Sequence, residues 1–111
     1  MPMFAVNSDA EFDEKILKSP DLVLAGFTAD WCPHCKVLAP KMKEMASQMP
    51  ELNLARVDTD KAFDSAEKFG IKTIPTLVFF KNGEKIASMS AAGVQDQEIM
   101  NFISSNLKAK A

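Results

Sequence analysis

The chain has 111 residues, enough for one ordinary domain and too few for two. Apolar residues make up 47% and charged residues 25%, the profile of a globular protein and not of a disordered one. The formal net charge is −2 and the lysines and arginines gather in no stripe, which argues against nucleic acid as a partner. We therefore expect residues 1–111 to form a single domain.

The apolar runs of the chain are short. The longest, Leu22 to Phe27 and Thr76 to Phe80, fall far below the roughly 20 residues that a membrane helix needs. The N-terminal segment has neither the basic start nor the apolar centre of a secretory signal. These features predict a cytoplasmic protein that does not bind membranes.

In chain order, the first expected elements are a short strand, a helix and a buried strand. Met3 to Val6 is the candidate short strand. Ser8 followed by Glu11 is a capping-box pattern and predicts that a helix begins there. The apolar run within Asp21 to Thr28 is bounded by breakers and is typical of a strand buried on both faces.

The middle of the chain predicts a longer helix and a further strand. Apolar residues recur at helical spacing from Val37 to Met49, and Pro40 inside this pattern predicts a kink. Leu52 to Val57 alternates apolar and polar residues, which predicts a strand. We expect Asp58 or Asp60 to cap the short helix that follows.

The last third predicts a hairpin and a final helix. Gly70 ends the short helix, and Thr76 to Phe80 is a β-branched and aromatic strand. Asn82-Gly83 is a tight-turn signal that leads into a second strand at Lys85 to Met89. A last amphipathic helix follows, whose apolar residues are Ile99, Phe102, Ile103 and Leu107.

This order of elements predicts an α/β fold with a mixed central sheet of four to five strands flanked by four helices. Strand–helix–strand units favour parallel pairing, and the hairpin adds an antiparallel pair. The chain has two cysteines, Cys32 and Cys35, which fall where the buried strand ends and the long helix begins. That carboxyl edge of the sheet is where open α/β proteins usually place their chemistry.

The spacing of the two cysteines argues for chemistry and not for a structural disulfide. A disulfide between Cys32 and Cys35 would close a very small loop, which constrains the unfolded chain little. Two vicinal thiols suggest either redox chemistry or a metal. At a helix start, free backbone N–H groups and the helix dipole favour the thiolate of Cys32, and the thiolate is the nucleophile.

Four blocks of the chain resemble the thioredoxin family, and the resemblance covers nearly the whole sequence. The blocks are Ala29-Asp30-Trp31-Cys32-Pro33-His34-Cys35-Lys36, Ala39-Pro40, Phe69-Gly70-Ile71-Lys72-Thr73-Ile74-Pro75-Thr76 and Phe80-Lys81-Asn82-Gly83-Glu84. The resemblance implies a thioredoxin fold and a thiol–disulfide oxidoreductase that reduces protein disulfides. Cys32 would attack the substrate disulfide and Cys35 would resolve the mixed disulfide.

The resemblance also implies how the surroundings of Cys32 are built. Ile74-Pro75 matches the cis-proline of the family, which would place this loop against Cys32. Trp31, Ile74 and the Ala92-Gly93 segment would form an apolar groove for an extended substrate. The protein would be a monomer without organic cofactor or metal, its redox centre being the Cys32–Cys35 disulfide. A flavin-dependent thioredoxin reductase would supply electrons, and disulfide-containing proteins would be the substrates.

Two positions depart from the family pattern. Pro33-His34 stands where most thioredoxins carry Gly-Pro and resembles the pair of periplasmic disulfide-forming oxidases. We hypothesise that a protonated His34 stabilises the Cys32 thiolate and makes the couple less reducing than that of ordinary thioredoxins. Gly26 stands where thioredoxins usually have a buried aspartate that accepts the proton of the resolving thiol, and Arg56 matches the lysine that accompanies it. A water, His34 or another carboxylate could replace that acid, or the resolving step is slower here.

Other readings of the same residues remain open. The Pro33-His34 pair leaves room for a disulfide isomerase or oxidase. Cys32, His34 and Cys35 are three candidate ligands for a metal-binding module, although structural zinc normally takes four. A glutaredoxin-like enzyme fits Thr73-Ile74-Pro75 but lacks the Gly-Gly-x-x-Asp glutathione signature after the hairpin.

Overall fold

The computed structural model describes residues 3–110. Five strands and the helices alternate along the chain. Their bounds are β1 Met3–Val6, α1 Asp9–Phe12, η1 Asp13–Leu17, β2 Leu22–Thr28, α2 Pro33–Gln48, β3 Asn53–Asp58, α3 Phe63–Lys68, β4 Thr76–Lys81, β5 Glu84–Ser90 and α4 Asp96–Lys110. The segment η1 is a π-helical turn that continues α1. Every element expected from the sequence is present within one or two residues at most of its bounds, except that the helix expected from Val37 begins at Pro33.

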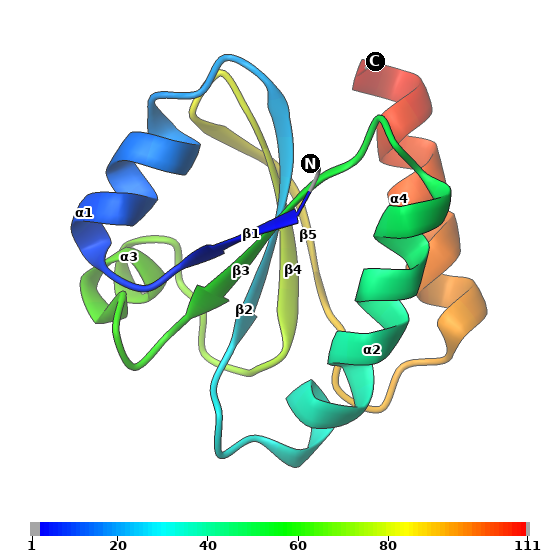
Figure 1. Cartoon of the computed structure of the whole chain (residues 1–111), viewed down its shortest axis with the longest axis horizontal. Coiled ribbons are helices and arrows are strands. Elements are labelled where there is room, and N and C mark those ends of the chain that lie inside the picture. The colour runs from blue at the N-terminus through cyan, green and yellow to red at the C-terminus, as the bar shows by residue number, and fades with distance from the viewer. Residues whose placement is uncertain (1–2, 111) are drawn as a thin grey trace.

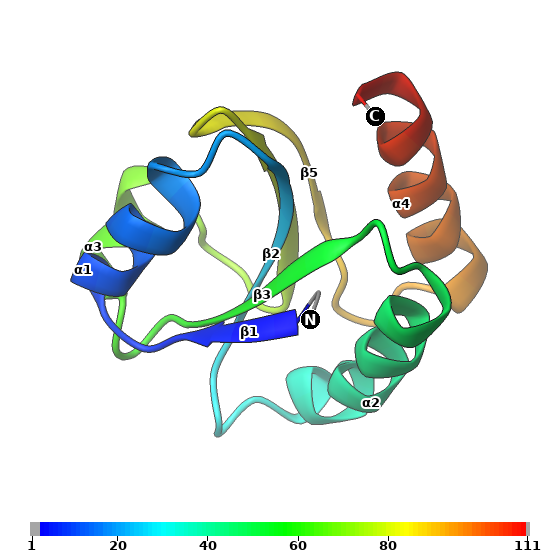
Figure 2. The same cartoon turned by 45° about the horizontal axis from the view of Figure 1, so that its top comes forward.

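The strands form one mixed sheet in the order β1-β3-β2-β4-β5. The pairs β1/β3 and β3/β2 are parallel, and the pairs β2/β4 and β4/β5 are antiparallel. Helices α1 and α3 cover one face of this sheet, and α2 and α4 cover the other (Figure 1 and Figure 2). The predicted mixed sheet with helices on both faces is confirmed.

Each face of the sheet has its own apolar core, because successive strand residues point to opposite sides. In β2, Phe27 packs with Phe12 of α1 on the α1/α3 face. Leu24, on the other face of the same strand, belongs to a cluster that contains Leu38 of α2 and Ile103 of α4. The central strand β2 is thus buried on both sides, as its continuous apolar run predicted.

The helix start at Ser8 follows the capping-box pattern. The Ser8 hydroxyl accepts a hydrogen bond of 3.0 Å from the backbone N–H of Glu11. The Glu11 carboxylate reaches back and accepts one of 2.8 Å from the backbone N–H of Asn7. These bonds satisfy donors that the first helical turn leaves free.

The prediction that Asp58 or Asp60 caps α3 is wrong. The N-cap residue of α3 is Ala62, which makes no side-chain cap bond. A turn that follows β3 separates both aspartates from the helix start, and the Asp58 carboxylate accepts from the backbone N–H of Asp60 at 2.9 Å instead. Asp9 of α1 supplies the cap, since its carboxylate accepts from the backbone N–H and the hydroxyl of Ser65 at 2.8 and 2.7 Å.

Two glycines and an asparagine end elements as their sequence pattern predicted. Gly70 has a φ of 69° just after α3, the left-handed position that suits glycine at a helix end. Asn82 and Gly83 have φ values of 53° and 76°, as the tight turn between β4 and β5 requires. A Cβ atom at Gly83 would also collide with the carbonyl oxygen of Leu17.

None of the helices between residues 3 and 110 has the length and apolar character needed to cross a membrane.

Candidate active site

Cys32 lies at the start of α2, as its N-cap residue, and Pro33 is the first helical residue. Proline suits that position because its missing N–H would have no partner there. The Cys32 sulfur accepts a hydrogen bond of 3.2 Å from the backbone N–H of Cys35. A backbone donor directed at the sulfur, at the positive end of a helix, is the environment that a nucleophilic thiolate requires.

Both cysteines are free thiols and both are nearly inaccessible, with 3% of Cys32 and 4% of Cys35 exposed. Burial, followed by the hydrogen bond with Cys32, raises the pKa of the Cys35 thiol to about 12. Cys35 therefore keeps its proton at neutral pH. The two sulfurs are chemically unequal, although their side chains lie one helical turn apart.

The loop before β4 lies against Cys32. The Ile74–Pro75 peptide bond is cis, the geometry that the resemblance implied. The Cys32 thiol lies 3.8 Å from the carbonyl oxygen of Ile74, and the Ile74 side chain packs on the small cluster formed by Ala29, Cys32 and Cys35. The sequence-predicted site residues Cys32, Cys35, Ile74 and Pro75 are thus brought together.

Trp31 forms an exposed wall beside this loop. Its side chain is 65% exposed, and its indole N–H donates a hydrogen bond of 2.9 Å to the carboxylate of Asp60. Trp31 and Ile74 line one surface groove of about 400 Å³, together with Phe63, which is 61% exposed. The sequence analysis missed Asp60 and Phe63, and an exposed aromatic residue at the start of α3 is the only signal that it carried for them.

Ala92 and Gly93 lie in the exposed loop between β5 and α4. This loop is tied to the site because the backbone N–H of Ala91 donates to the carbonyl oxygen of Pro75 at 2.9 Å. The His34 ring lies over Gly93, where a Cβ atom would sit 3.9 Å from the ring carbon Cε1. His34 is thus directed at the loop that precedes α4.

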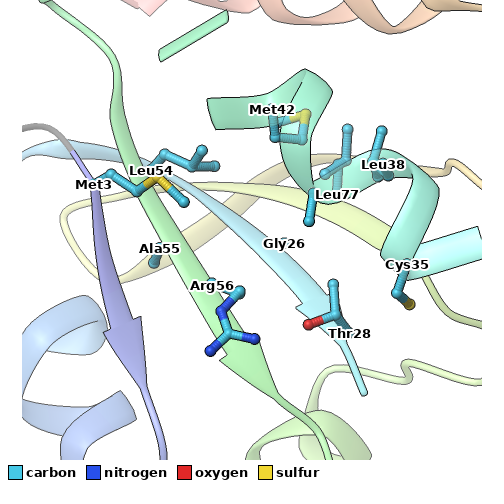
Figure 3. Close-up of a pocket in the computed structure, with 11 residues that line it drawn as sticks. Met3, Gly26, Thr28, Cys35, Leu38, Met42, Leu54, Ala55, Arg56 and Leu77 are labelled. Atoms are coloured by element: carbon cyan, nitrogen blue, oxygen red, sulfur yellow. The ribbon is translucent and has the colours of Figure 1, made fainter. Parts of the chain in front are cut away.

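Gly26 leaves a small cavity beneath Cys35. It lies in β2 opposite Arg56 of β3 and Leu77 of β4. The cavity has a volume of about 40 Å³, and Figure 3 shows the residues that line it, Cys35 and Arg56 among them. A Cβ atom at Gly26 would make only ordinary contacts, 3.7 Å to Leu77 and 3.8 Å to the carbonyl oxygen of Ala55. The space of the missing side chain therefore remains largely open.

Charged side chains surround the outer edge of the site. Arg56, expected to point to solvent, is about half exposed, with 46% of its side chain accessible, and it lies 3.9 Å from the carboxylate of Asp30. Within residues 3–110, no group of three or more His, Cys, Asp or Glu side chains is arranged to hold a metal ion.

A mixed sheet that places a vicinal dithiol at a helix start, against a cis-proline loop, defines a thiol–disulfide oxidoreductase with protein-disulfide reductase activity. Residues 3–105 match the thioredoxin family model. The chain belongs to the thioredoxin family.

Known relatives agree with this assignment. The chain is 34% identical to "Probable thioredoxin-2" of Caenorhabditis elegans over 96% of its own length and 74% of that protein. It is 36% identical to "Thioredoxin 1" of Synechococcus elongatus over 83% of its length and 87% of the relative. The solved structure of Plasmodium falciparum thioredoxin superposes with a TM-score of 0.82 at 31% identity, covering 91% of this chain and 96% of that one. The fold is therefore the thioredoxin fold.

Proposed function

We propose that Cys32 is the nucleophile and Cys35 the resolving thiol in the reduction of protein disulfides. The Cys32 thiolate attacks a substrate disulfide, one substrate sulfur leaves as a thiolate, and a mixed disulfide forms. Cys35 then loses its proton and attacks the Cys32 sulfur, which releases the second substrate thiolate and leaves a Cys32–Cys35 disulfide. The observation that supports these roles is the contrast between the backbone N–H aimed at Cys32 and the pKa of about 12 at Cys35.

Substrate recognition is proposed for the residues around the sulfur. Trp31, Ile74 and Pro75 form one side of the approach to Cys32, and Ala92 and Gly93 form the other. An extended substrate segment would lie between them and pair with the backbone of Ile74, since main-chain bonds hold a peptide with little regard to its sequence.

The Trp-Cys-Pro-His-Cys sequence supports a finer proposal, a couple less reducing than that of an ordinary thioredoxin. Couples in this superfamily span roughly 150 mV, about 7 kcal/mol for two electrons. A cationic His34 in the first turn of α2 would favour the reduced, anionic state of Cys32 and so raise the potential. Equilibration of wild type and His34→Gly with graded glutathione buffers tests this. We expect a more negative potential for the variant, and an unchanged one would contradict the role of His34.

The proposed cellular setting follows from the family. The protein acts as a single-domain monomer in the cytoplasm, and a flavin-dependent thioredoxin reductase returns two electrons to the Cys32–Cys35 disulfide. A potential well above the cytosolic glutathione poise would instead favour the alternative of a disulfide isomerase or oxidase.

Reduction of insulin by dithiothreitol, with and without the protein, tests the proposed reaction. We expect wild type to accelerate it and Cys32→Ser to be inactive. Cys35→Ser should form a mixed disulfide with the substrate that mass spectrometry detects, because Cys32 can still attack but nothing resolves the product. Full turnover by Cys35→Ser would contradict the assigned roles.

A further inference from the structure

The resolving step poses a problem that the cavity beneath Cys35 does not solve. Cys35 must lose a proton that its burial retains, and the pKa of its thiol is about 12. The wall of the cavity is almost wholly apolar and includes no carboxylate. A water held there would need two to four polar partners, which such a wall does not offer. The proton therefore has no acceptor on that side of the thiol.

A second opening connects Cys35 to the surface. It is a groove of about 310 Å³ that Cys35 lines together with Thr28, Asp30, Lys36 and Arg56. Bulk water enters such an open groove, so it offers the buried thiol a route for its proton.

Arg56 is the charged residue common to the two spaces. Among the charged residues that line the cavity or the groove within residues 3–110, it alone lines both. Residues alternate along β3, so Arg56 shares the face of Leu54, which packs in the α2/α4 core. Figure 3 shows Arg56 and Thr28 together on this face of the sheet, toward the end of the cavity where Cys35 lies. Since Gly26 stands opposite Arg56 without a side chain, no group fills the space between the guanidinium and the cysteine.

We propose that Arg56 supports the resolving step electrostatically, by stabilising the Cys35 thiolate as it forms. This proposal rests on the proposed function. The Cys35 proton passes to water in the groove, and the thiolate electron pair forms a bond to the Cys32 sulfur. The bond between Cys32 and the substrate breaks, and the substrate thiolate leaves and takes a proton from solvent. Arg56 touches none of the reacting atoms and acts only through Cys35.

The other charged groups around Cys35 do not replace Arg56. The Cys32 sulfur is bonded to the substrate at this stage and carries no charge. Lys36 on α2 and Asp30 in the loop before it have opposite charges and line the groove only. The Asp30 carboxylate also lies 3.9 Å from the Arg56 guanidinium, so it weakens the field of Arg56 and does not add to it.

The two steps can be separated with one equivalent of 5,5′-dithiobis(2-nitrobenzoate) added to the reduced protein. Attack by Cys32 releases the first thionitrobenzoate, and resolution by Cys35 releases the second. In Arg56→Gln we expect the second phase to slow about fivefold at neutral pH, because removing one half-exposed cation costs a modest Coulomb energy. The first phase should stay within about twofold of wild type. The pH midpoint of the second phase should move upward, a change that a purely structural defect would not cause.

Three further variants complete the test. Arg56→Lys should restore most of the rate, since it keeps the charge. Lys15→Gln, which removes a similarly exposed cation paired with Glu11 on the other side of the sheet, should leave both phases unchanged. Asp30→Asn should leave the second phase unchanged or faster.

The outcomes that would overturn the proposal are distinct from failure of the proposed function. An unchanged second phase in Arg56→Gln, an equal slowing of both phases, or no rescue by Arg56→Lys would each contradict the role of Arg56. A slower second phase in Asp30→Asn would identify Asp30 as the proton acceptor and would also overturn it. A wild-type protein that releases no thionitrobenzoate at all would refute the assignment of Cys32 as nucleophile instead.

Discussion

The two faces of the sheet are built for different tasks. The α1/α3 face is packed with aromatic rings, and Phe12 alone contacts Phe27, Phe69 and Phe80 with ring centroids 5.7 to 5.8 Å apart. The α2/α4 face carries both cysteines at one edge and contains the cavity at Gly26. One face is filled to close packing, whereas the other leaves space beside its reactive thiol. The difference teaches that the stability of this fold and its chemistry depend on opposite sides of the same strands.

The largest expected effect on this comparison comes from Phe12→Ala. Removing a fully buried ring leaves a void that the surrounding rings cannot fill, and the free energy of unfolding should fall by about 3–5 kcal/mol. Urea denaturation measures the loss. The thionitrobenzoate release rates of the molecules that remain folded should not change, and a large change would show that the two faces are not independent.

Gly26→Ala sharpens the comparison from the other side. A Cβ atom fits the cavity with ordinary contacts, and the backbone of Gly26 is not in the left-handed region. The substitution should therefore stabilise the protein by about 0.5–1 kcal/mol, chiefly by restricting the unfolded chain. The same urea experiment measures it. A destabilised variant would mean that the α2/α4 face is as tightly packed as the other face.

Asp9→Asn tests the polar link between α1 and α3. Hydrogen bonds from the Ser65 hydroxyl, and next from the Ser65 backbone, lower the pKa of the Asp9 carboxyl. A lowered folded-state pKa contributes stability above the unfolded value, near 3.9, and this contribution is lost as the pH falls through the folded value. Stability curves between about pH 2 and 6 should thus converge at acid pH for wild type and variant. Curves that stay parallel would contradict the role of the ionised carboxylate.

The smallest effect on stability is expected for Phe63→Ser, because this side chain is largely exposed at the start of α3. The change should leave the free energy of unfolding within about 0.5 kcal/mol of wild type. It should nevertheless weaken the apparent affinity for insulin, since Phe63 shares a groove with Trp31. An unchanged rate at limiting insulin would show that substrates do not reach α3.

The sequence predicted those parts of the molecule that depend on neighbours along the chain. The apolar run of β2, the Asn82-Gly83 turn and the cysteine pair at the start of α2 are each encoded within a few residues. Contacts between distant segments left no local signal, and the hydrogen bonds of Trp31 with Asp60 and of Asp9 with Ser65 are examples. The role of Asp58 was misjudged for that reason, because proximity in sequence suggested a cap that a residue of another helix provides.

The candidate site divides in the same way. Gly26 was recognisable as a departure from the family pattern, but a missing side chain does not reveal in sequence whether its space collapses or stays open. That the space stays open, and that Arg56 and Cys35 both line it, depends on how three strands and α2 meet. Such a meeting point lies beyond any pattern of residue spacing.

The measurement that tests the central claim most directly is the rate of alkylation of each cysteine as a function of pH. Brief treatment of the reduced protein with iodoacetamide, followed by peptide mass spectrometry, reports Cys32 and Cys35 separately. The account predicts modification of Cys32 at neutral pH and none of Cys35 until the pH approaches the pKa of about 12. Equal modification of both thiols near neutrality would contradict the division into a nucleophile and a protonated resolving thiol.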